Sequence, residues 1–134
     1  MPSNGLYRKL TWVIGIILSL AYFGCAAPYT MQAPPQFKKF DNRTTFSWIT
    51  ADGVMLKARE VENYPEATLE FWTAATEQHL VKSGYAHQET SCFDTDEKRR
   101  GCTLRFVLPH GAEDWVFEET IFVVDDTLVL VEAT

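Results

Sequence analysis

Two cysteines, Cys92 and Cys102, are the residues in this chain best placed to form a covalent cross-link. They flank the charged stretch Phe93–Gly101. In an oxidising compartment such a pair most simply forms a disulfide, and closing so short a loop stabilises a domain by about 2–3 kcal/mol. We predict this disulfide. Two alternatives stay open: buried free thiols, and a redox-active pair, which normally has the closer Cys-x-x-Cys spacing.

The same two cysteines could be grouped with His87 and His110 as zinc ligands. Their spacings fit no common zinc finger or ribbon, and the compartment favours cystine over thiolate. We therefore predict no metal site and no cofactor. His79 lies at the edge of a predicted apolar helix face and is expected to be a packing histidine.

Acidic residues flank aromatic ones in the C-terminal third of the chain: Glu113, Asp114, Glu118 and Glu119 around Trp115 and Phe117. A carboxyl group with a raised pKa can serve as a general acid, so acid catalysis on a stacked sugar is one interpretation. Acidic side chains on an exposed sheet face are, however, ordinary solvation. The chain has no nucleophile elbow, phosphate-binding glycine loop or nucleotide fingerprint. Whether it is an enzyme stays open, with a noncatalytic role favoured.

Trp115 and Phe117 are the predicted partner surface. Most aromatic residues of so small a domain must pack in its core, and those that stay exposed mark a contact with a partner. Trp115 is the better candidate of the two because it adjoins the acidic turn.

The third cysteine, Cys25, ends an apolar segment near the N-terminus. Arg8 and Lys9 precede an uncharged run of about 15 residues that ends in small residues, which is typical of a secretory signal. A membrane-spanning helix needs roughly 20 apolar residues, so an uncleaved anchor is a lesser alternative. We predict a signal peptide over residues 1–24.

The sequence "YFGC" at the end of this signal resembles the bacterial lipobox. Gly24 and Cys25 fit that motif, while Tyr22 and Phe23 replace its usual aliphatic and small residues. The resemblance implies cleavage before Cys25, diacylglycerol on its sulfur and a fatty acyl group on the new amine, and two or more chains hold a protein firmly to a bilayer. Ala26 after the cysteine implies the outer membrane, with the domain facing the periplasm. Cleavage after Ala27 instead would give a secreted or soluble periplasmic protein.

The segment after the lipidated cysteine, residues 25–36, is rich in proline and is predicted to be an extended tether. Residues 37–134 are long enough for one domain with one core. The net charge of −6 becomes more negative when the signal is removed. Such a chain repels phosphate backbones, so we predict no nucleic-acid partner. The expected partners are the membrane, through the lipid anchor, and a protein of the envelope.

The predicted fold class is α+β, with an antiparallel sheet of about five to six strands and one amphipathic helix on one face. Two strands surround the turn Ala51–Gly53, with a predicted interruption at Arg59–Glu60. The helix follows, with Asn63 and Glu66 as its capping pair. Its predicted apolar face is Leu69, Trp72, Ala75, Thr76, His79 and Leu80.

The helix is predicted to end at Gly84, with Tyr85 folding back on its last turn. Four strands follow it. In the second of these, Cys102, Leu104, Phe106 and Leu108 are predicted to share one face. The last strand, "TLVLVEA", is continuously apolar and is expected to be central or covered on both faces.

From Ala51 onward the stretch "ADGVMLKAREVENYPEATLEFWTAATEQHLVKSGY", with "GCTLRFVLPHGAEDWVFEETIFV" and "LVLVEA", resembles small uncharacterised bacterial lipoproteins. The order of elements is more remotely similar to the PsbP-like α+β domain, which usually has a further C-terminal helix. The resemblance implies a lipid-anchored envelope protein with a noncatalytic binding or scaffolding domain. It implies no catalytic residues. The alternatives are a small envelope enzyme acting on glycan through Glu113, Glu118 or Glu119, and a structural subunit of an envelope complex.

Overall fold

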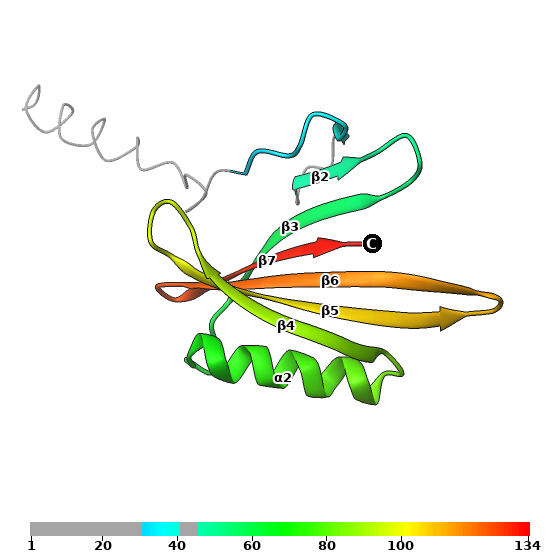
Figure 1. Ribbon diagram of the computed structural model, residues 1–134. Helices are drawn as coiled ribbons and strands as arrows, with labels where there is room; N and C mark the ends of the chain where they lie inside the picture. Colours follow the sequence, from blue (N-terminus) through cyan, green and yellow to red (C-terminus); the bar gives the residue numbers. More distant parts are fainter. Residues whose placement is uncertain (1–30, 41–45) are drawn as a thin grey trace, which may run out of the picture. The chain divides into compact units, whose positions relative to one another are not determined.

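The computed structural model describes residues 31–40 and 46–134 (Figure 1). The predicted signal peptide, Cys25 and the first half of the tether, residues 25–30, lie outside the described residues. Within this part of the chain, one helix accompanies a single antiparallel sheet. The elements are β1 (Lys38–Phe40), β2 (Phe46–Ile49), β3 (Met55–Glu62), α2 (Leu69–Lys82), β4 (Ala86–Asp94), β5 (Arg100–His110), β6 (Glu113–Val124) and β7 (Thr127–Ala133).

The sheet has seven strands in the order β1-β2-β3-β7-β6-β5-β4. The α+β class is therefore confirmed, but the predicted five to six strands are too few. The additional strand is β1, a three-residue edge strand that pairs with β2. A strand this short has too few residues to show an alternating pattern in the sequence. No helix of the described residues is long and apolar enough to cross a membrane.

The hairpin β2–β3 forms around the predicted turn, where Gly53 has a φ of +94°. The interruption expected at Arg59–Glu60 is wrong, because β3 runs unbroken from Met55 to Glu62. Its register with β7 explains this, since Arg59 pairs with Leu130 and Glu60 pairs with Val129. The continuous ladder of backbone hydrogen bonds tolerates charged side chains here.

Strand β7 lies at the centre of the sheet between β3 and β6, as its apolar sequence predicted. Leu128, Val129 and Leu130 are all buried although they alternate between the two faces. Leu128 and Leu130 belong to the core on the helix side of the sheet.

Helix α2 begins later than predicted, and Asn63 and Glu66 are not its caps. The N-cap is Thr68, whose Oγ1 accepts a hydrogen bond from the backbone N–H of Phe71 at 3.3 Å. A threonine at this position satisfies one of the free amides of the first turn. The segment before it is a loop, fixed by Asn63, whose side chain bonds the backbone of Ala67 in both directions.

The helix ends at Gly84 as predicted. Gly84 has a φ of +97°, its N–H donates to the Val81 carbonyl, and the Tyr85 N–H donates to the Leu80 carbonyl. This is the Schellman arrangement, which favours glycine at the left-handed position. Tyr85 then folds back, and its ring packs against Phe106.

The core lies between α2 and one face of the sheet. It contains Leu69, Cys102, Leu104, Phe106, Ile121, Leu128 and Leu130. The helix lies along β4, β5 and β6 (Figure 1). In the described part of the chain its backbone makes no comparable approach to β7 or β3. On this face of the sheet, the part formed by β7 and β3 therefore lies beside the helix and not under it.

Candidate functional site

A groove of about 460 Å³ lies along this part of the sheet, between one side of α2 and strands β3, β7 and β6. We call it the α2 groove. The apolar part of its sheet wall comprises Val61, Ile121, Leu128 and Leu130. Its helix wall comprises Trp72, Ala75, Thr76, His79 and Leu80. The predicted helix face is thus divided between core and groove. Leu69 is in the core, Trp72 and Leu80 pack against the core and also line the groove, and Ala75, Thr76 and His79 line the groove.

The position of Trp72 in the groove wall is fixed by a hydrogen bond. Its indole Nε1–H donates to the Asn63 side-chain oxygen at 2.7 Å. Asn63 is only 6% exposed and is itself held by the backbone of Ala67. Trp72 is half-buried, and an indole that finds such a partner is held in one orientation. The aromatic part of the wall is therefore formed before any ligand binds.

Charged groups line the groove beside this apolar surface. Glu119 is 8% exposed, and no hydrogen bond to its carboxyl group is found among the described residues. Glu132 pairs with Glu119 across β6 and β7, and its Oε1 lies 2.9 Å from the Arg59 Nε. Burial, and next the Glu132 carboxylate, raise the pKa of Glu119, while the Arg59 guanidinium opposes this.

Substituting Glu119→Gln should stabilise the protein at neutral pH. Because its pKa is raised, the Glu119 carboxyl group binds its proton more tightly in the folded protein than in the unfolded chain. The free energy of unfolding therefore falls as the pH rises above 4.5, the usual pKa of a glutamate. The other groups facing it, Arg59, Glu132 and His79, remain in both proteins. We expect a gain of about 1 kcal/mol near pH 7.5, measured by urea unfolding, that shrinks near pH 4.

Glu118→Gln is the matched control for this prediction. Glu118 is the next residue of β6 but lies on the opposite face, where its Oε1 is 2.6 Å from the Arg105 Nε. Exposed ion pairs of this kind contribute little to stability, so we expect no pH-dependent gain. A gain for Glu119→Gln that is the same at both pH values would contradict the prediction.

The carboxylates of the alternative enzyme interpretation are not brought together. Glu118 and Glu119 point to opposite faces of β6, since neighbouring residues of a strand alternate. Glu113 and Asp114 are exposed and lie where β6 begins, pairing with His110 and Pro109. Acid catalysis on a glycosidic bond requires two carboxyl groups flanking one bond. This set does not provide them.

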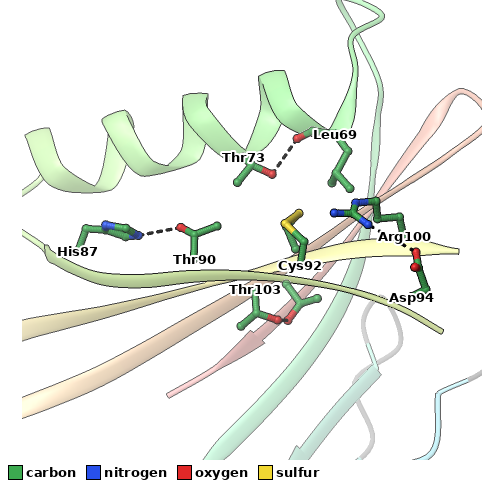
Figure 2. The surroundings of a disulfide bond; sticks show 10 residues. Leu69, Thr73, His87, Thr90, Cys92, Asp94, Arg100 and Thr103 are labelled. Carbon is green, nitrogen blue, oxygen red and sulfur yellow. Dashed lines mark hydrogen bonds and ion pairs between the residues drawn. A yellow bond between two sulfur atoms is a disulfide. The ribbon is translucent and has the colours of Figure 1, made fainter.

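The structure joins Cys92 and Cys102 in a disulfide, as predicted. The two residues are direct partners in the β4–β5 register. Figure 2 shows the Cys92 sulfur on the side of the sheet that carries Leu69 and Thr73 of α2. Cys102 is buried and Cys92, on the edge strand, is exposed. The disulfide therefore links the edge strand β4 to β5, near the beginning of the helix.

The other members of the imagined zinc set have separate partners. His87 shares a 2.8 Å hydrogen bond with the Thr90 hydroxyl (Figure 2), and its Nδ1 lies 3.6 Å from a Glu77 carboxylate oxygen. His110 packs against Trp115, with ring centroids 5.4 Å apart. Among the described residues, no cluster of three or more metal-binding side chains is found.

The predicted partner surface has one exposed and one packed member. Trp115 is 56% exposed at the end of the β5–β6 hairpin, and Val116 beside it is 49% exposed. Phe117 is half-buried and packs against Tyr85 and Phe106. The exposed apolar surface at this end of the sheet is thus centred on Trp115.

Arg59, Glu132 and Asn63 are not predicted as site residues from the sequence. Arg59 and Glu132 look like ordinary solvated charges in strands, and their pairing depends on the β3–β7 contact. Glu119 was considered, but as an exposed carboxylate. One signal was present: in β6 the alternation Phe117, Glu119, Ile121 places Glu119 on the apolar face.

Comparison with models of known protein families gives no match to this chain, and comparison with curated protein sequences gives no match either.

Proposed function

We propose that this protein is a noncatalytic binding domain of the bacterial envelope, held to the membrane by lipid on Cys25. The observation that supports binding is the α2 groove, an apolar depression whose walls are already set by packing. Apolar pockets with a few convergent polar groups are the usual form of a ligand site. The lipobox-like segment supports the anchor and the compartment, and the disulfide agrees with an oxidising environment.

The alternative of a glycan-cleaving enzyme has less support. It depends on Glu113, Glu118 and Glu119, which lie on different faces and ends of β6. The alternative of a structural subunit is supported by the exposed Trp115 and Val116. Purification of the protein with one stoichiometric partner that is lost on Trp115→Ala would favour that alternative.

Replacing Cys25 by serine tests the anchor. We expect the wild-type protein to fractionate with membranes and to carry the added mass of acyl chains on an N-terminal cysteine. The Cys25→Ser variant should carry no acyl mass and should remain uncleaved or be redirected, because the thioether can no longer form. Intact-mass analysis of membrane and soluble fractions measures both.

The control for this experiment is the double variant Cys92→Ala/Cys102→Ala, which should keep the acyl mass. A mature wild-type protein that begins at Pro28 and has no acyl mass would contradict the lipid anchor and support ordinary secretion.

A further inference from the structure

We propose that the α2 groove binds a small organic cation with a hydrocarbon body, whose charged group sits against Glu119. This proposal rests on the proposed binding function and names the class of ligand. It is carried by three observations in the groove: its size and apolar walls, the buried carboxyl group of Glu119, and the pairing of Arg59 with Glu132.

The size and lining of the groove suit a small ligand. Its volume of about 460 Å³ lies within the range of roughly 300–1,000 Å³ that is typical of small-molecule sites. Leu128, Leu130 and Ile121 form its floor and are nearly inaccessible to water. At its rim, Val61 and Tyr64 are 37% and 79% exposed. A hydrocarbon body would cover this apolar surface.

The charges of the groove leave Glu119 without a counter-charge of its own. The Arg59 Nε is engaged by Glu132 at 2.9 Å, so two carboxyl groups share one guanidinium. Glu119 is more than nine-tenths buried and has no hydrogen bond within the described part of the chain. The Glu119 carboxyl oxygens are not completely shut off from solvent, but a carboxylate this deeply buried is still disfavoured unless it is paired. An ammonium group would supply the missing partner.

The same arrangement selects against anions. A ligand carboxylate in this part of the groove would face Glu119 and Glu62 of the lining, and Glu132 pairs with Glu119 on the neighbouring strand. The arginine of the lining, Arg59, is already paired with Glu132. An aromatic wall adds to the preference for a cation, because ammonium groups are attracted to the faces of tryptophan and tyrosine rings, and both Trp72 and Tyr64 line the groove.

The test uses three probes that share one hydrocarbon ring and differ in charge: cyclohexylammonium, cyclohexanol and cyclohexanecarboxylate. Each is titrated at neutral pH into the full mature chain in the same detergent micelles. The reporter is the Trp72 indole N–H resonance, which is assigned from its loss in Trp72→Phe. We expect cyclohexylammonium to bind at least about ten-fold more tightly than cyclohexanol, the factor expected for one charge-assisted hydrogen bond. Cyclohexanecarboxylate should bind most weakly.

The variant Glu119→Gln should reduce the preference for the ammonium probe to about two-fold or less, because the amide carries no charge. Glu118→Gln, which changes the neighbouring residue on the opposite face, should bind as the wild type does. Each probe partitions into the same micelles to the same extent with all three proteins, so the change in the selectivity ratio from wild type to Glu119→Gln or Glu118→Gln is independent of this partition.

The outcomes separate the two proposals. If cyclohexanol binds as well as cyclohexylammonium, or if Glu119→Gln keeps the preference, the groove binds ligands but the cationic class is wrong. Tighter binding of the carboxylate overturns the class as well. If no probe shifts the Trp72 resonance, the groove is not a binding site, and the proposed binding function fails with it.

Discussion

Replacing Phe106 by alanine is expected to lower the free energy of unfolding by about 3–5 kcal/mol, the usual cost of removing a buried aromatic side chain. Phe106 is fully buried at the middle of β5. Its ring contacts those of Tyr85, His87 and Phe117, with centroids 5.4–6.4 Å apart. These contacts hold β4, β6 and the end of α2 against β5. The surrounding side chains can therefore fill only part of the cavity that removal of the ring leaves. Urea unfolding at neutral pH measures the loss.

Phe71→Ala is the matched control for this variant. Phe71 is in the first turn of α2 but is 52% exposed, and alanine has the better helix propensity. We expect a change of about 0.5–1 kcal/mol at most. A loss below about 1 kcal/mol for Phe106→Ala would contradict the register of β5, because a one-residue slip moves every side chain of a strand to the other face.

The arrangement of β4 and β5 could be predicted because two independent features agree. The alternation of Cys102, Leu104 and Phe106 defines one apolar face, and the disulfide requires Cys92 opposite Cys102. Both conditions are met by one register. Gly101 was assigned to the loop, but it belongs to β5. A Cβ atom there would lie 2.3 Å from the Phe122 ring, a close approach between strands that the sequence does not show.

The beginning of α2 was placed too early because Asn63 and Glu66 have the spacing of a capping pair. In the structure Asn63 bonds Ala67 and Trp72 instead. The contact with Trp72 depends on the path of the loop, which local patterns do not determine. Thr68, the true N-cap, has no acidic or amide residue three positions later, so the usual sequence pattern is missing.

The α2 groove was beyond sequence analysis for a physical reason. Two of its charged residues, Arg59 and Glu119, come from β3 and β6, and they are brought near Glu132 of β7 only because β7 returns between β3 and β6. Predicting that one helix covers one sheet face does not say which strands it leaves bare. The width of a seven-stranded sheet exceeds that of a single helix, and the strand count was underestimated.

Reducing the Cys92–Cys102 disulfide is expected to cost about 2–3 kcal/mol, because the bond closes a short loop in the unfolded chain. The sequence separation of the two residues is 10. The melting temperature should fall by roughly 8–24 °C, at roughly 4–8 °C per kcal/mol for a domain of this size. Cys92→Ala/Cys102→Ala should reproduce the loss without reductant, and adding reductant to this variant should then change nothing.

Thiol labelling after unfolding tests the same bond independently of stability. Without reductant, protein taken from the envelope should label at neither Cys92 nor Cys102, and with reductant at both. Labelling of both residues before reduction would contradict the disulfide. The two cysteines differ in their surroundings. Cys102 lies in the core under α2, while Cys92 is on the exposed edge strand β4. Loss of the link should therefore loosen β4 first, and hydrogen exchange should rise in Ala86–Asp94 before it rises in Thr127–Ala133 at the centre of the sheet.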